Sequence, residues 1–388
     1  MNDFQLHCKS IQNLLQQSDA NACLITSSVN IYYLTGQIFD GYLYLPQEGK
    51  PLYFVRKPGA FSDENQIPIR KPEDIPALLN ERSLSLPKVL GLEAGQLTYN
   101  DFLRLQNVFQ PEKTVNATAL LRQVRMIKTP WEIEQFRLSA QKHKQAYREI
   151  PTVFVAGMTD LEFQYEIERL MRKNGSIGIF RTFGSNMDIF MGSVLTGENA
   201  GNASPCDFAL GGGGAHPSLP IGANGTPIRE NQSVMVDMAG NFTAYMTDMT
   251  RVFAYGNLPE EAIRAHQTSI EMHEWLRKNV KAGFACSEIY CQSLRMVEKA
   301  GLSANFMGIK QQSKFVGHGV GIEINELPVL TERSKEILQA GMVFAYEPKF
   351  VLPKTGAVGV ENTYLVTNEG LENLTDFEES LIPLTHNS

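Results

Sequence analysis

The chain has 388 residues, of which 43% are hydrophobic and 20% charged, as is typical of a folded globular protein of two domains. Its formal net charge is −7 with no basic tract and no apolar run of membrane-spanning length, so neither nucleic acid nor a membrane is an expected partner. Met1–Ser10 lacks a secretion-signal core, and the five cysteines include no CxxC pair, which together favour a cytoplasmic protein without disulfides or zinc–thiolate sites.

The first third of the chain has the pattern of a small α/β domain. Short apolar runs predict strands at Ala22–Ser27 and Lys88–Glu93. Two β-rich runs, Tyr42–Leu45 and Pro51–Arg56, are separated by Gln-Glu-Gly-Lys and predict a hairpin. A short helix is expected at Asn100–Val108.

A domain boundary is expected near residue 128. Thr129-Pro130-Trp131-Glu132 has the spacing of a capping box with proline at the first helical position. Thr159-Asp160-Leu161-Glu162 repeats this pattern and opens a second helix. The sequence therefore predicts an N-terminal domain at 1–125 and a C-terminal domain at 126–388.

The C-terminal domain alternates helical and strand-like segments. A third helix is expected from Pro259 to Val280, and a fourth with Ser287 as its cap and its end at Gly301. The pattern predicts an α+β fold of antiparallel strands with helices packed outside. The expected strands are Ile189–Leu195, Ser233–Met238, Tyr245–Phe253, Met342–Tyr346 and Gly359–Val366.

Two aspartates stand in strand-like surroundings. Asp237 ends the apolar run Val234–Val236, and a carboxylate in such a place is costly unless it is paired or bound to a cation. Asp248 lies in the next strand-like run. If these strands pair antiparallel through a turn near Asn241, both carboxylates can reach one point.

The same pattern recurs downstream. Glu347 follows the apolar run Met342–Tyr346, Glu361 lies in a second such run, and His318 is flanked by glycines that allow close backbone approach. Four carboxylates crowded together repel one another unless cations neutralise them. Carboxylates with one imidazole suit a pair of Mn²⁺, Co²⁺, Fe²⁺ or Zn²⁺ ions, which can activate a water as a nucleophile.

These segments resemble the metallopeptidase family that contains aminopeptidase P, prolidase and methionine aminopeptidase. VMVDMAG and YMTDMTR are similar to its two-aspartate hairpin, VGHGVGIEINELP to its histidine loop, and MVFAYEP and VGVENTYLVTNEG to its two glutamate strands. NIYYLTG and LLRQVRMIKTPWEIEQFR resemble the N-terminal domain and linker helix of the aminopeptidase P, prolidase and creatinase branch. The resemblance implies a C-terminal pita-bread fold with a curved antiparallel sheet and outer helices, preceded by a smaller α/β domain.

The resemblance also implies a function and a set of roles. It implies a hydrolase with two divalent metal ions, most often Mn²⁺. The enzyme would cleave the first bond of a short peptide, as a Xaa-Pro aminopeptidase or dipeptidase does. It also implies a homodimer. Asp237 and Glu361 would bridge the ions, Asp248 would complete one site, and His318 with Glu347 the other. Glu347 would also assist proton transfer. His216, in GGGGAHPSLP, occupies roughly the place of a substrate-binding histidine.

Three positions depart from the family pattern. Asn325 stands where a second histidine is usual, Gly359 where an arginine is frequent, and Lys349 where a glycine follows Glu-Pro. Asparagine donates a hydrogen bond but cannot carry a proton, so Asn325 and His216 are expected to orient the substrate carbonyl. Asn325 and Gly359 keep open the alternative of a metal-dependent hydrolase of a small non-peptide amide or C–N bond. A metal-binding homologue without catalysis is a further alternative.

Overall fold

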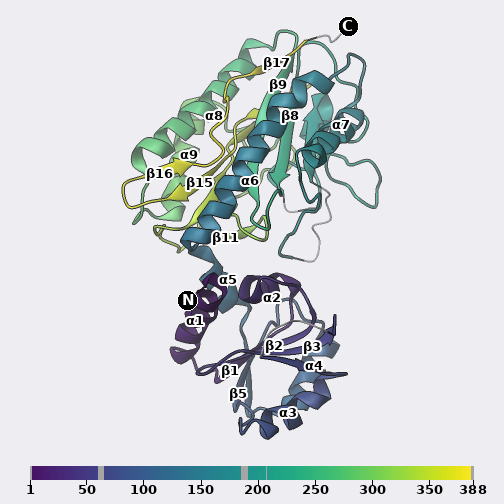
Figure 1. Ribbon diagram of the computed structural model, residues 1–388. Helices are drawn as coiled ribbons and strands as arrows, with labels where there is room; N and C mark the ends of the chain where they lie inside the picture. Colours follow the sequence, from purple (N-terminus) through teal and green to yellow (C-terminus); the bar gives the residue numbers. More distant parts are fainter. Residues whose placement is uncertain (1, 60–64, 185–190, 207, 386–388) are drawn as a thin grey trace. The chain divides into compact units, whose positions relative to one another are not determined.

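The chain folds into two compact units, Met1–Arg125 and Met126–Ser388, each with its own hydrophobic core (Figure 1). This computed structural model describes residues 2–59, 65–184, 191–206 and 208–385. Among these residues no helix is both long and apolar enough to cross a bilayer.

The first unit is a six-stranded mixed sheet with helices packed on it, in the order β4–β3–β2–β1–β5–β6. The expected hairpin is present as the antiparallel pair β2 and β3, and the strand expected at Lys88–Glu93 is β5. The segment Asn30–Gly36 forms most of a helix, which ends because Gly36 adopts the left-handed conformation at φ 73°. The elements are α1 (Asp3–Gln16), β1 (Ala22–Ile25), α2 (Ser28–Thr35), β2 (Asp40–Pro46), β3 (Leu52–Lys57), β4 (Gln66–Pro68), α3 (Ile75–Glu81), β5 (Val89–Leu92), α4 (Tyr99–Phe109), β6 (Lys113–Asn116) and α5 (Thr118–Met126).

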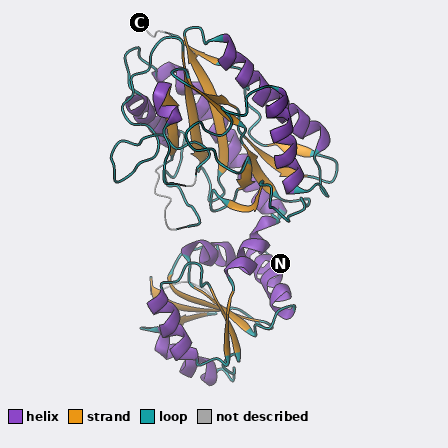
Figure 2. Ribbon diagram, turned by 180° about the vertical axis from the view of Figure 1, so that it is seen from behind, coloured by secondary structure: helices purple, strands orange, loops and turns teal. Residues whose placement is uncertain are grey.

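Long helices flank the strands of the second unit (Figures 1 and 2). Both expected capping boxes are present, with Thr129 and Thr159 accepting from the backbone N–H of the glutamate three residues on. The prediction that Ser287 caps the fourth helix is wrong. That helix begins at Cys286, whose N–H donates to the backbone oxygen of Glu336 at 3.0 Å, so a neighbouring loop satisfies one of the free donors. The helices are α6 (Pro130–Glu149), α7 (Asp160–Lys173), α8 (Glu260–Asn279) and α9 (Cys286–Lys299).

The strands of the second unit form three sheets among the described residues. Their orders are β17–β9–β8–β7, β11–β10–β12–β15–β16 and the pair β13–β14. Pairing is antiparallel as expected, except that β17 runs parallel to β9. The strand expected from Ile189 begins at Gly192, and Ile189 itself lies outside the described residues. The strands are β7 (Gly192–Thr196), β8 (Gln232–Gly240), β9 (Thr247–Tyr255), β10 (Gly317–Gly319), β11 (Glu326–Val329), β12 (Val343–Tyr346), β13 (Lys349–Leu352), β14 (Gly356–Gly359), β15 (Asn362–Val366), β16 (Leu371–Asn373) and β17 (Ile382–Leu384).

Two buried apolar clusters lie on opposite sides of the β8–β9 hairpin. One contains side chains of α6 and α7 and the alternate residues Val234, Val236 and Met238 of β8. The other contains side chains of α8 and α9, together with Met235. Because side chains alternate along a strand, Asp237 shares the face of Met235. The hairpin therefore presents Asp237 on the side of the cluster that contains Met235, α8 and α9.

Candidate metal centre

The β8–β9 hairpin brings two aspartates to one face of the sheet. In the antiparallel register Asp237 pairs with Thr250, and Ala239 pairs with Asp248. Residues two positions apart point the same way and paired residues share a face, so Asp237, Asp248 and Thr250 project together. The pairing expected from the sequence is present, with its turn near Asn241.

His318 comes from the short strand β10, which is held between β11 and β12. A Cβ on Gly317 would lie 2.2 Å from the oxygen of Ala345, and one on Gly319 would lie 2.0 Å from that of Leu327. The glycines are thus needed for close backbone approach, as the sequence indicated. Nδ1 of His318 lies 3.2 Å from the Gly319 oxygen, which favours the tautomer whose Nε2 lone pair faces Asp248 and Glu347.

The two glutamates follow and precede strands of the adjoining sheet. Glu347 comes directly after β12 and Glu361 directly before β15, and they are 3% and 1% exposed. The N–H of Glu361 donates to the Thr250 oxygen at 3.2 Å, and the Thr250 hydroxyl donates to Glu361 Oε2 at 2.7 Å. Glu361 is therefore held directly against the hairpin by these two hydrogen bonds with Thr250.

Buried Arg251, in β9, links the hairpin to the segment that holds Glu361 and Asn362. Its guanidinium donates to the backbone oxygen of Glu361 and to the side chain of Asn362, each at 2.8 Å, and to the oxygens of Thr375 and Glu378. A planar group with five N–H donors suits such a junction, because every donor meets a fixed acceptor. Arg251 thus holds the backbone around Glu361 without touching its carboxylate.

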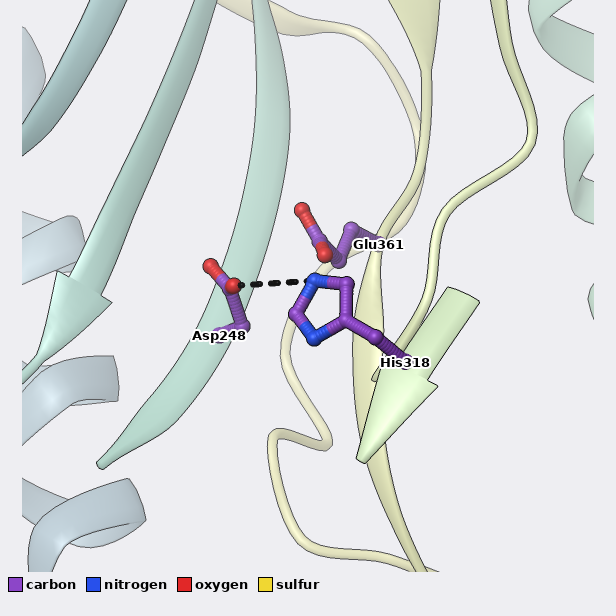
Figure 3. A group of neighbouring side chains, drawn as sticks. All are labelled: Asp248, His318 and Glu361. Carbon is purple, nitrogen blue, oxygen red and sulfur yellow. Dashed lines mark ion pairs between the residues drawn. The ribbon is translucent and has the colours of Figure 1, made fainter. Parts of the chain in front are cut away.

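The five predicted ligand residues converge and form two groups that share Glu361. In each group the ligand atoms lie within 4.8 Å of one another: Asp248, His318 and Glu361 form the first, and Asp237, Glu347 and Glu361 the second. Figure 3 shows the first group, with three side chains from three different segments pointing toward one another. His318 Nε2 lies 3.8 Å from Asp248 Oδ2 and 3.5 Å from Glu347 Oε1.

The first group fits a divalent cation. Oε1 of Glu361, and Oε1 of Glu347, which lies 3.5 Å from His318 Nε2, are buried and have no hydrogen-bond partner among the described residues. Leaving such an oxygen unpaired is costly, and a cation held by carboxylates and an imidazole would remove that cost. The donor set of Asp248, His318 and Glu361 is of the kind that Mn²⁺, Fe²⁺, Co²⁺ or Zn²⁺ accepts.

The second group already surrounds a cation that belongs to the chain. The ammonium nitrogen of Lys349 lies 2.9 Å from Asp237 Oδ2, 2.7 Å from Glu347 Oε2 and 2.9 Å from Glu361 Oε2. Its side chain is 0% exposed. A second divalent ion does not fit this group, because the oxygens that would bind it already accept hydrogen bonds from the lysine.

Burial and neighbouring charges shift the pKa values of the residues in this cluster. Burial, and then the charge of Asp237, raise the pKa of Asp248 well above its usual range. Burial, and then the charge of Asp248, do the same to the pKa of Glu361. Burial also acts to raise the pKa of Asp237, but the Lys349 ammonium brings it below the usual value. Burial acts to lower the pKa of Lys349, yet its three carboxylate neighbours hold it well above normal.

The two proposed substrate-binding residues lie in other surroundings. His216 is exposed, and its Nδ1 contacts the side chain and N–H of Ser218; no contact of the described residues joins it to the carboxylates. Asn325 uses its amide on the backbone of Phe183, accepting from its N–H at 2.7 Å and donating to its oxygen at 2.8 Å. The contacts of Asn325 hold the chain near Phe183 in place, and its expected role toward a substrate stays a prediction.

Sequence reasoning noted Lys349 only as a departure from a pattern and missed what it contacts. A signal was present in the sequence, because Lys349 directly precedes the apolar run Phe350–Leu352. A lysine at the start of an otherwise apolar strand needs an anionic partner, just as the strand aspartates need a cationic one.

Comparison with known proteins gives full-length matches. The family model described as metallopeptidase family M24 matches residues 134–368, and that of the creatinase/prolidase N-terminal domain matches residues 8–127. A Xaa-Pro dipeptidase of Pyrococcus horikoshii is 24% identical over 378 residues, covering 96% of this chain and 98% of the relative. The uncharacterized peptidase YqhT of Bacillus subtilis is 24% identical over 384 residues, covering 97% and 99%.

Solved structures match the whole fold. The prolidase from Pyrococcus horikoshii superposes with a TM-score of 0.79 at 22% identity, over 97% of this chain and 100% of that chain. A Xaa-Pro dipeptidase from Bacillus anthracis gives a TM-score of 0.80 at 22% identity, over 98% and 100%. The expected pita-bread fold, preceded in the sequence by a smaller N-terminal domain, is thus confirmed.

Proposed function

The chain belongs to metallopeptidase family M24, and from that premise we propose that it is a metal-dependent hydrolase that cleaves the N-terminal peptide bond of short peptides. A Xaa-Pro dipeptide, or a longer peptide with proline second, is the first candidate substrate, since full-length relatives bear the name Xaa-Pro dipeptidase. One observation carries the proposal: Asp237, Asp248, His318, Glu347 and Glu361 converge from separate strands on one buried point.

Asp248, His318 and Glu361 would hold the cation, with Mn²⁺ as the expected ion. When bound, the cation supplies the Lewis acidity that makes a water nucleophilic near neutral pH and polarises the scissile carbonyl. The dinuclear centre expected from the sequence does not fit, because Lys349 occupies the oxygens of the second group.

Glu347 has the geometry of a proton acceptor. Its Oε2 accepts from Lys349 at 2.7 Å, which fixes the carboxylate, while Oε1 has no hydrogen-bond partner among the described residues. Oε1 lies 3.5 Å from His318 Nε2 and therefore faces the proposed cation position. A carboxylate held by one oxygen can take a proton on the other from an attacking water and return it to the leaving amine.

Substrate would approach from the side of the aspartates and the histidine. The side chains of Asp237, His318 and Asp248 are 19%, 15% and 11% exposed, whereas those of Glu347 and Glu361 are 4% and 1% exposed. The charged amino terminus of a peptide carries the sign that this acidic entrance favours. This arrangement suits a peptidase acting on chain ends.

One observation favours a second candidate function. Asn325 is engaged with the Phe183 backbone, so the side chain that stands where the family usually has a histidine is not open toward a substrate carbonyl. A hydrolase of a small non-peptide amide would depend less on a contact between the Asn325 side chain and the substrate carbonyl. A metal-binding homologue without catalysis is the third possibility, and the assay below separates all three.

The test is a substrate panel with defined metal. The protein is stripped with chelator, reloaded with Mn²⁺, Co²⁺, Fe²⁺ or Zn²⁺, and assayed on Xaa-Pro and matched Xaa-Ala dipeptides and tripeptides. We expect metal-dependent cleavage with a preference for Xaa-Pro, abolished in Glu347→Gln. Metal binding without cleavage of any peptide would refute peptidase activity; turnover of small amides under those conditions would then support the second candidate.

A further inference from the structure

The Lys349 ammonium has the surroundings that proteins usually give to a metal ion. It is fully buried and lies within 2.9 Å of oxygens from three carboxylates, those of Asp237, Glu347 and Glu361. An ammonium has three N–H donors and no acceptor, and here each donor has its own carboxylate. The group is therefore fully satisfied where it lies.

The same oxygens cannot serve this lysine and a divalent ion together. Carboxylate oxygens lie about 2.0–2.2 Å from ions such as Zn²⁺, so an ion bound to these three would nearly coincide with the ammonium nitrogen. Two cations at that separation would repel each other strongly. Binding an ion to the second group would require Lys349 to leave.

The backbone of Lys349 is held in place by two neighbouring segments. Its oxygen accepts from the N–H of Met307 at 2.8 Å, and it is the Cα partner of Gly359 in the β13–β14 pair. A Cβ on Gly359 would lie 2.9 Å from Lys349 Cα and 2.6 Å from the Pro348 oxygen, so the two strands approach closely there. Two of the three positions that depart from the family pattern are thus direct neighbours across one ladder.

Charge gives an independent argument. The four carboxylates, when ionised, carry four negative charges, of which the ammonium offsets one and a single divalent cation two. One negative charge then remains, which a peptide's amino terminus can offset. Without the lysine, a second divalent ion would be needed to bring the same carboxylates near neutrality.

We propose that Lys349 replaces one of the two metal ions, so that the chain works with a single divalent cation at Asp248, His318 and Glu361. This inference deepens the proposed function and rests on it only for what the cation does in catalysis. Lys349 then supplies a fixed positive charge beside Glu347 and Glu361, and activity should saturate at one equivalent of metal.

Metal stoichiometry tests the proposal directly. The full chain is stripped, titrated with Mn²⁺ by calorimetry, and its bound metal is counted by mass spectrometry after desalting. We expect one equivalent in the wild type and two in Lys349→Gly and Lys349→Ala, which free the three oxygens. Electron paramagnetic resonance should show an isolated Mn²⁺ in the wild type and an exchange-coupled pair in the variants.

Lys128 offers a matched control. It is the other lysine among the described residues that is buried, and its ammonium lies 3.2 Å from Glu326. Lys128→Met also removes a buried cation from its carboxylate, but away from the ligand oxygens, so it should still bind one equivalent. If Lys128→Met also binds a second equivalent of Mn²⁺, the second equivalent in the Lys349 variants reflects a general loss of structural rigidity. That result would overturn the inference.

The remaining outcomes are equally decisive. Two equivalents or none in the wild type would overturn the proposal, even if the variants do not fold. One equivalent in folded Lys349→Gly and Lys349→Ala would also overturn it. If the wild type binds one ion and the variants two, while no peptide is cleaved, the single-ion site stands and the proposed peptidase activity falls.

Discussion

The ammonium of Lys349 lies 2.7 Å from the carboxylate of Glu347, two residues earlier in the chain, and both side chains are buried. The two residues enter the site from β13 and from the end of β12, which are joined only by Pro348 and Glu347 itself. Because the pair lies within one short segment, its geometry depends little on distant elements. The lysine is thus a built-in part of the carboxylate cluster.

Removing that ammonium should make stability depend on metal. Taking one partner from a buried ionic cluster typically costs about 3–5 kcal/mol, because the remaining charges are left uncompensated. In chelator, Lys349→Ala should lose stability of this order relative to the wild type. Saturating Mn²⁺ should restore most of it, because an ion that binds only the folded state stabilises that state. Denaturant unfolding with and without Mn²⁺ measures both effects.

Lys128→Met serves again as the control. It should also be less stable than the wild type, because Glu326 loses a buried partner, but Mn²⁺ should stabilise it no more than it stabilises the wild type. Equal responses to Mn²⁺ in Lys349→Ala and Lys128→Met would contradict the prediction.

The convergence of the five proposed ligand residues was predictable from sequence, and their chemistry explains why. A carboxylate at the end of a buried strand is costly, so Asp237, Glu347 and Glu361 stood out in a single chain even before the resemblance to a family fixed their order. The antiparallel hairpin followed from the spacing of two strand-like runs and one turn. Both predictions use only residues that are close together in the sequence, so a single sequence is enough to make them.

The contact of Lys349 with Asp237 and that of Asn325 with Phe183 join segments that are distant in the sequence. The ammonium reaches Asp237 from 112 positions away, and Asn325 reaches the Phe183 backbone across 142 positions. Strand register and rotamer decide such contacts, and no periodicity in the sequence encodes them. The same holds for Ser287, whose expected capping role was taken by the backbone of Glu336.

The proposed ligands should differ in their effect on metal binding. His318→Ala removes the single nitrogen ligand of the first group and should weaken Mn²⁺ binding by more than the roughly 10–100-fold typical of losing an outer-shell contact. Asp237→Asn alters a side chain that contacts Lys349, and should still bind one equivalent. Calorimetric titration of both variants measures this. Wild-type affinity in His318→Ala would show that the cation binds elsewhere.

Asn325 should act as a positioning residue for the segment around Phe183. Its amide makes two hydrogen bonds to the Phe183 backbone, and the adjoining Ile324 N–H donates to the Arg181 oxygen at 2.8 Å. Asn325→Ala should therefore speed tryptic cleavage after Arg181, measured by mass spectrometry. Asn325→Asp, which keeps an acceptor but loses the donor, should fall between it and the wild type. An unchanged cleavage rate in Asn325→Ala would contradict the positioning role.

Two buried histidines should make the protein less stable in mild acid. His266 donates through Nε2 to the Glu379 oxygen and accepts the Gly359 N–H on Nδ1, and His273 contacts the Val360 oxygen and the Tyr364 hydroxyl. Burial lowers the pKa of each from its usual 6.5 to about 4. Both therefore fold in the neutral form, whereas the unfolded chain protonates them near pH 6.5.

The sign follows from proton counting. Between about pH 6.5 and pH 4 the unfolded chain binds more protons, so the contribution of each histidine is fully present above pH 6.5 and falls by about 1.4 kcal/mol per pH unit as the solution is acidified. Urea unfolding in chelator across this range removes any effect of metal loss. His266→Gln and His273→Gln, whose amides keep a donor and an acceptor but do not titrate, should each flatten the slope by up to that amount. A slope equal to the wild type's in both variants would show that other groups, such as the carboxylate cluster, govern acid stability.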